Sequence, residues 1–203
     1  MANKHREVCY QCHRPQTSCM CTYIQAIETN TRFVILMHPK EFKRTKNGTG
    51  HFTNLSLKNC EIFVGIDFST HEKINQILND PHTLAYVLYP SKTSINLNQE
   101  KIGQADKSSV IFLIDSTWPC SRAMLKASPN IDALPKVSFT HTKNSKFAFK
   151  EQPNSYCLST MESTLCLLEL LNAHGIEENT QEELAHFLLP FYKMVDYQLK
   201  CNL

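Results

Sequence analysis

The sequence predicts an α/β fold with a mainly parallel sheet, and three observations support it. Short apolar runs alternate along the chain with segments of helical periodicity, as in strand–helix–strand units. The clearest run, Val110 to Ile114, is apolar throughout, which is typical of a strand buried on both faces. The composition, 42% hydrophobic and 20% charged over 203 residues, suits one globular domain with a small appendage.

Five strands are predicted, each from a short run of mostly apolar residues. The first and third stop at Pro39 and Pro90, because proline cannot donate to a sheet ladder. The fourth stops at a polar cluster that begins with Asp115. In chain order, the predicted strands are 32–38, 61–65, 84–89, 110–114 and 136–140.

Five helices are predicted between and after these strands. The first and the last carry apolar residues at helical spacing, and the second has Ile74 and Ile77 on one face. The third has a proline in its first turn. Ser159 and Glu162 have the spacing of a capping box before the fourth, which ends at Gly175. The predicted helices are 51–59, 71–79, 118–127, 161–174 and 180–197.

Four of the nine cysteines lie close together near the N-terminus, as Cys9-x-x-Cys12 and Cys19-x-Cys21. An odd number of cysteines without an export signal argues against a disulfide framework. Four thiols at this spacing predict a closed, structural Zn²⁺ site, and the metal would supply the folding energy that the few apolar neighbours cannot. A redox dithiol and an iron–sulfur cluster are the alternatives. We therefore expect a zinc knuckle over 1–25 and one domain over 26–203.

The net charge is only +2, but basic residues dominate 1–60 and 115–150, whereas acidic residues dominate 151–200. A basic face of this kind fits a polyanion such as RNA, and scattered solvated charges are the alternative. No apolar run approaches the roughly 20 residues that span a bilayer, and the first residues lack the apolar core of a signal peptide. We expect a cytoplasmic protein.

Asp115-Ser116-Thr117-Trp118-Pro119 follows directly on the fourth predicted strand and holds the only tryptophan. Ligands of open α/β sheets bind outside the carboxyl ends of strands, so an acid, two hydroxyls and a large aromatic there form a candidate site. The alternative is an N-cap for the next helix, with the proline in its first turn. Both roles are compatible.

Several motifs together resemble the DTW-domain family in order and spacing, over nearly the whole chain. They are Cys9-x-x-Cys12-x-x-Pro15, Cys19-x-Cys21, His38-Pro39-Lys40-Glu41, Asn47-Gly48-Thr49-Gly50, Asp115 to Pro119 with Arg122-Ala123-Met124, and Ser159-Thr160-x-Glu162. Two departures occur: Gly48 is inserted into the Asn-Thr-Gly of the family, and Cys120 stands where an acid is frequent.

The resemblance implies a fold related to the knotted SPOUT methyltransferases. It also implies a tRNA-uridine aminocarboxypropyltransferase, which moves the 3-amino-3-carboxypropyl group of S-adenosylmethionine to N3 of a uridine in tRNA. The alternatives are a SPOUT-like RNA methyltransferase and a non-catalytic, zinc-dependent RNA-binding module. The sequence implies no protein partner.

Candidate site residues follow from these motifs. Asp115 is the predicted catalytic group, as a base or as a residue that orients the uracil, and Trp118 would stack on a base or support the pocket. The helix opened by Ser159 could receive the methionine carboxylate at its free N–H groups. The predicted walls of the cofactor site are Tyr89, Pro90, Leu113, Ile114, Ser116, Thr117, Leu158, Ser159, Thr160, Glu162 and Ser163.

The loop 40–50 is the predicted contact with tRNA phosphates. Its basic residues are Lys40, Lys43, Arg44 and Lys46. A zinc knuckle beside Lys4, Arg6 and Arg14 also fits an RNA-binding role. A solvated basic loop is the alternative.

Overall fold

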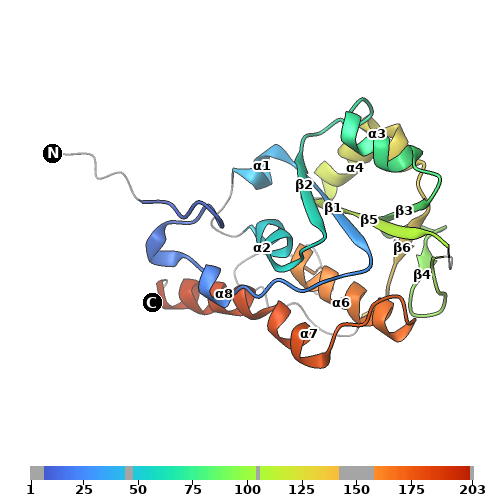
Figure 1. Ribbon diagram of the computed structural model, residues 1–203. Helices are drawn as coiled ribbons and strands as arrows, with labels where there is room; N and C mark the ends of the chain where they lie inside the picture. Colours follow the sequence, from blue (N-terminus) through green and yellow to red (C-terminus); the bar gives the residue numbers. More distant parts are fainter. Residues whose placement is uncertain (1–6, 44–47, 104–105, 142–157, 202–203) are drawn as a thin grey trace.

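The computed structural model describes residues 7–43, 48–103, 106–141 and 158–201, and within them it contains a six-stranded, all-parallel sheet. The strand order is β2-β1-β5-β3-β6-β4, with β5 between β1 and β3 near the middle (Figure 1). The strands are β1 (Arg32–Met37), β2 (Cys60–Val64), β3 (Thr83–Leu88), β4 (Ile95–Asn96), β5 (Ser108–Asp115) and β6 (Lys136–Ser138). The predicted α/β class and the five predicted strands are confirmed. The two-residue β4 was not predicted.

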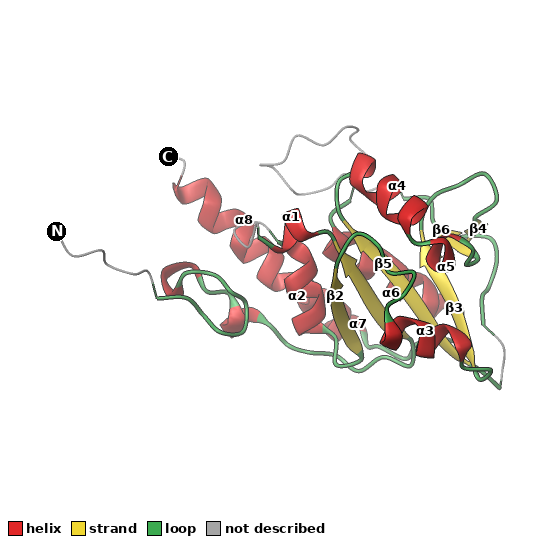
Figure 2. Cartoon of the chain, turned by 90° about the horizontal axis from the view of Figure 1, so that it is seen from above, coloured by secondary structure: helices red, strands yellow, loops and turns green. Residues whose placement is uncertain are grey.

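Helices cover both faces of the sheet (Figure 2). Alternate residues of β1 point to opposite sides: Ile35 belongs to a core with α2, α6, α7 and α8, and Leu36 to a core with α3, α4 and α5. The helices are α1 (Pro39–Phe42), α2 (Thr49–Ser56), α3 (Glu72–Asn79), α4 (Trp118–Ala127), α5 (Pro129–Asp132), α6 (Thr160–Ala173), α7 (Gln181–Phe187) and α8 (Leu189–Cys201). Both faces of the sheet are therefore buried, as the apolar strands predicted.

The helices differ from the prediction in three places. The predicted loop 40–50 contains most of the short α1, which has His38 as its N-cap, and also the start of α2. The predicted last helix, 180–197, is two helices that part at Leu188. Pro190, in the first turn of α8, explains the break because proline cannot donate the N–H that a continuous helix needs. The helix α5, which opens on a proline, was not predicted.

The cysteine-rich segment packs on the rest of the protein. It contains two 3₁₀ turns, η1 (Gln16–Ser18) and η2 (Cys21–Tyr23). Cys12 and Met20 belong to the same buried core as the helices α2 and α8. The Lys193 ammonium of α8 lies 5.5 Å from the centre of the Tyr23 ring. The knuckle is therefore held against α2 and α8.

Within the described ranges, none of the helices combines the length and apolar character needed to cross a membrane.

Candidate functional site

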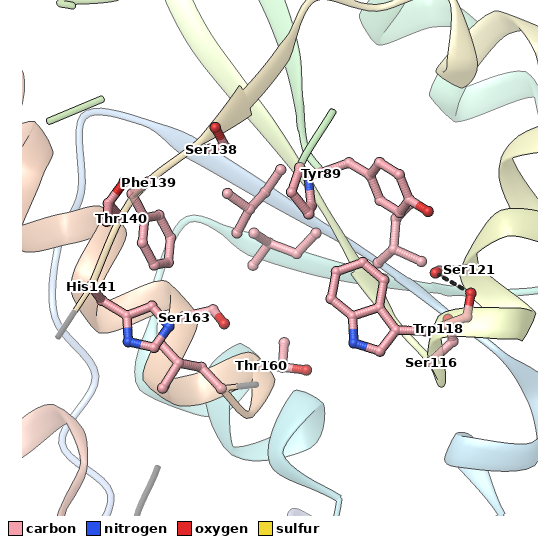
Figure 3. Close-up of a pocket in the computed structure, with 15 residues that line it drawn as sticks. Tyr89, Ser116, Trp118, Ser121, Ser138, Phe139, Thr140, His141, Thr160 and Ser163 are labelled. Carbon is pink, nitrogen blue, oxygen red and sulfur yellow. Dashed lines mark hydrogen bonds between the residues drawn. The ribbon is translucent and has the colours of Figure 1, made fainter. Parts of the chain in front are cut away.

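A pocket of about 520 Å³ opens at the carboxyl ends of β3, β5 and β6, beside the first turn of α6 (Figure 3). Its position is where open parallel sheets bind ligands. The predicted site residues that line it are Tyr89, Pro90, Leu113, Ile114, Ser116, Trp118, Leu158, Thr160 and Ser163. Tyr89 and Ser163, 74 positions apart in the chain, thus line the same cavity.

Three predicted wall residues lie elsewhere. Thr117 is exposed at the N-cap position of α4. Ser159 and Glu162 form the capping box of α6: the Glu162 carboxylate accepts hydrogen bonds from Ser159 N at 2.9 Å and from Ser159 Oγ at 2.7 Å. The Glu162 carboxylate therefore lies at the same helix end that was predicted to bind the methionine carboxylate. Two negative charges would meet there. This capping geometry favours a structural role for Ser159 and Glu162.

Six further residues line the pocket without having been predicted from the sequence, most of them at the end of β6. They are Leu88, Ser121, Ser138, Phe139, Thr140 and His141. The strand-end rule that selected Asp115 applies equally to the predicted strand 136–140. That signal would have found four of the six.

Two aromatic pairs stand on opposite sides of the pocket (Figure 3). The rings of Tyr89 and Trp118 meet edge to face, with centroids 5.9 Å apart, and Trp118 is 41% exposed. The rings of Phe139 and His141 make a similar pair at 6.0 Å. Exposed aromatic faces with nearby hydroxyls suit a flat heterocyclic ligand that carries polar groups.

Asp115 ends β5 and is fixed by three elements. Its main-chain oxygen accepts a hydrogen bond from His38 N at 3.0 Å, after β1. Its Oδ1 accepts one from Thr160 Oγ1 of α6 at 2.6 Å. Its other oxygen, Oδ2, faces Gly50. If residue 50 carried a Cβ, the atoms nearest to that Cβ would be those of the Asp115 carboxyl group and Met37 Cε. Asp115 does not line the pocket, but Thr160 does and connects the carboxylate to it.

The start of α2 explains how the family motif around Gly50 works in this chain. The inserted Gly48 is the N-cap residue, so Thr49 and Gly50 form the first turn. The N-terminal ends of α2 and α6 thus both meet at Asp115. The N-terminal end of a helix carries partial positive charge, which stabilises a carboxylate there.

The four knuckle thiols lie in the arrangement of a tetrahedral metal site. All four sulfurs are within 4.8 Å of one another, with Cys9 to Cys21 at 3.6 Å and Cys12 to Cys19 at 3.8 Å. Four sulfurs bound to Zn²⁺ at about 2.3 Å are about 3.8 Å apart, so the observed spacing fits the ion. Hydrogen bonds from the Cys12 and Gln11 main chain lower the pKa of Cys9 to about 6, whereas burial raises the pKa of Cys21. The donor set can therefore hold one metal ion.

The residues predicted to contact RNA differ in their exposure, and some lie outside the described part of the chain. Lys40 on α1 and Lys43 at its C-cap are exposed, whereas Arg44, Lys46, Lys4 and Arg6 lie outside the described residues. The prediction for Arg14 is wrong: it is only 2% exposed, its Nε donates to Ser18 O at 2.8 Å, and its guanidinium lies over the Phe52 ring. Arg14 joins the knuckle to α2 and cannot offer its charge to a phosphate.

The chain resembles known proteins over nearly its full length. The DTW domain model matches residues 6–199. The chain is 30% identical to tRNA-uridine aminocarboxypropyltransferase 2 of Drosophila melanogaster, over 96% of this chain and 76% of that protein. It is 27% identical to the Mus musculus protein of the same name, over 97% of this chain and 65% of that protein. It is 26% identical to tRNA-uridine aminocarboxypropyltransferase A of Arabidopsis thaliana, over 98% and 83%.

No solved structure gives a significant match, so the relation of this sheet to the knotted SPOUT fold stays a prediction. The chain spans about two thirds of the mouse relative and more of the fly and plant relatives. With a domain model that matches almost its full length and a relative at 30% identity, the chain belongs to the DTW domain family.

Proposed function

We propose that this protein transfers the 3-amino-3-carboxypropyl group of S-adenosylmethionine to N3 of a uridine in tRNA. The observation that carries the proposal is the Asp115–Thr160 hydrogen bond beside an aromatic-walled pocket at the strand ends. The names of the curated relatives give the reaction class and the tRNA substrate.

The pocket fits the sulfonium donor in size and chemistry. A volume of about 520 Å³ lies within the range of ligand pockets, roughly 300–1,000 Å³. The rings of Tyr89 and Trp118 offer surfaces for a purine, and the hydroxyls of Ser116 and Ser163 offer partners for the ribose and amino-acid parts. When bound, S-adenosylmethionine supplies a carbon already activated by a positively charged sulfur.

The proton on uridine N3 must be removed during the reaction, because the neutral ring is a poor nucleophile. Asp115 is the proposed acceptor, and Thr160 connects it to the pocket. The Thr160 hydroxyl donates to Asp115 Oδ1 at 2.6 Å and still has lone pairs for an N3–H donor. A proton leaving N3 can pass to the hydroxyl oxygen while the hydroxyl proton passes to the carboxylate. Trp118 would hold the uracil or the donor by stacking.

The four cysteines would hold a structural Zn²⁺. With all four positions taken by thiolates, such a site has no open coordination position for chemistry. The metal would instead fix the knuckle against α2 and α8, where Cys12 and Met20 are buried.

The decisive experiment incubates the protein with tRNA and labelled S-adenosylmethionine and identifies the modified nucleoside by mass spectrometry. We expect uridine carrying the aminocarboxypropyl group, with methylthioadenosine released. A methylated nucleoside would instead indicate an RNA methyltransferase, and tRNA binding without methylthioadenosine would indicate a binding module. Asp115→Asn should abolish transfer, whereas the matched Asp106→Asn, in an exposed loop before β5, should not.

A further inference from the structure

We propose that the knuckle and α1 together bind the nucleotides next to the target uridine, in a single-stranded part of the RNA. Bases would stack on Tyr10 and Phe42 while Lys40 and Lys43 contact phosphates. We call Tyr10, His13, Lys40, Phe42 and Lys43 the aromatic–basic strip. The inference rests on the proposed function, because it assigns the surface that holds the substrate beyond the pocket.

The exposure of the two aromatic rings is the first observation. Tyr10 is 96% exposed and Phe42 is 42% exposed. Tyr10 sits in the turn between Cys9 and Cys12, which is closed by main-chain hydrogen bonds from Cys9 N to Arg14 O and from His13 N to Cys9 O. An aromatic ring that is almost fully in water contributes little to folding, so packing does not account for it.

The second observation is that the two rings belong to one surface. The buried His51 ring lies between the knuckle and α1, with its centroid 5.5 Å from that of His13 and 5.4 Å from that of Phe42. His51 therefore joins the knuckle turn to α1. Exposed single hydrophobic side chains are common on proteins, but here the turn that carries Tyr10 and the helix that carries Phe42 meet at His51, and both lysines of α1 and its C-cap are exposed as well.

The third observation places this face next to the candidate site. The helix α1 follows β1 directly, and His38, its N-cap, donates a main-chain hydrogen bond to Asp115 O at 3.0 Å. The strip thus starts at the carboxyl edge of the sheet, beside Asp115, and extends away from it toward the knuckle. A strand of RNA with its target uridine at the pocket would have its neighbouring nucleotides over α1.

The chemistry of the strip favours single-stranded RNA over a protein. Lys40 and Lys43, before and after Phe42 in the chain, are both exposed, and α1 carries only Glu41, half-buried, as an acid. Aromatic faces beside cations are the pattern that binds unpaired bases and their phosphates. Bases within a duplex cannot reach such rings, so the bound segment must be a loop or another unpaired region.

The test measures the dissociation constant for tRNA with Tyr10→Ala and Phe42→Ala. Each should weaken binding by about 5- to 100-fold, the usual effect of losing one base stack. Tyr10→Phe, which keeps the ring, should bind as the wild type does. Lys40→Gln and Lys43→Gln should each lower the salt dependence of binding by about one unit of slope.

Tyr23→Ala is the matched control, because Tyr23 is 38% exposed on the knuckle but contacts Lys193 of α8 and lies outside the strip. It should bind tRNA normally. Unchanged tRNA affinity in a Tyr10→Ala/Phe42→Ala double variant with wild-type zinc content and melting temperature would overturn the inference. Because binding is measured without turnover, this outcome is independent of whether aminocarboxypropyl transfer is observed.

Discussion

Gly50→Ala tests whether the position of the Asp115 carboxylate controls the reaction. An alanine Cβ at this position would lie 2.7 Å from Met37 Cε and 2.9 Å from Asp115 Cγ, and closer still to Asp115 Oδ2. Ordinary contacts begin at 3.4 Å, so the carboxyl carbon must retreat by about 0.5 Å and the oxygen by more. The atoms in the way are side-chain ends, so the helix itself can stay in place.

The expected effect on activity exceeds the effect on stability. Alanine in a helix gains up to about 1 kcal/mol over glycine, which offsets part of the roughly 1–3 kcal/mol cost of overpacking. The carboxylate, however, is held to Thr160 by a 2.6 Å bond, and the shift pulls on that bond. Losing a hydrogen bond to a charged group costs about 1.5–3 kcal/mol, which corresponds to a rate about 10- to 100-fold lower.

The assay follows methylthioadenosine release at saturating tRNA and S-adenosylmethionine, with urea unfolding of the same samples. Gly65→Ala is the matched control, because it adds the same methyl group at 3.0 Å from the Phe68 ring, away from Asp115. It should cost stability and spare turnover. If Gly50→Ala turns over at the wild-type rate, the carboxylate position does not limit the reaction and the role proposed for Asp115 fails.

Three further predictions test the site and the knuckle. Thr160→Val should lower turnover by about 10- to 100-fold, since it removes the hydroxyl between Asp115 and the pocket. The double variant with Asp115→Asn should lose little more turnover than the Asp115→Asn variant alone. Additive losses in this pair would contradict a shared role of Thr160 and Asp115 in proton transfer. Cys12→Ser should release the one zinc ion per chain that metal analysis of the wild type should find, and retention of full zinc would argue against the ligand set. Arg14→Ala should lower the free energy of unfolding by about 1–3 kcal/mol, through the lost bond to a main-chain carbonyl and the lost contact with Phe52. Its tRNA salt dependence should stay unchanged, and a lower slope would place Arg14 at the RNA.

The strands were predictable because both faces of this sheet are covered. Val110 to Ile114 is apolar without interruption, and the structure buries alternate residues in the two cores on either side. The strand β4 left no such signal, because it is a two-residue edge strand whose Ile95 and Asn96 pair only with β6. The break at Leu188 was signalled by Pro190, but the amphipathic pattern continues across it and hides the boundary.

The part of the candidate site at the end of β5 was predictable from the sequence. The part that depends on packing between distant segments was not. Asp115 stands out as an acid directly after a buried strand. Its contacts with Thr160 and Gly50 come from helices far away in the sequence, whose positions no local pattern sets. Arg14 shows the opposite error: a cation near a metal knuckle suggested RNA contact, yet stacking on Phe52 buries it.

The strand order explains why the pocket opens beside β5. After β1 the chain turns to β2 at one edge, whereas the strands on the far side of β5 are β3, β6 and β4. The connection that leaves β1 and the one that leaves β3 at Tyr89 therefore diverge, and the carboxyl end of β5 lies between them. Asp115 and Trp118 occupy that opening, and the later helix α6 adds Thr160 from the side. A strand-end acid thus becomes a candidate catalytic group only because the sheet order leaves its end uncovered and a distant helix connects it to the pocket.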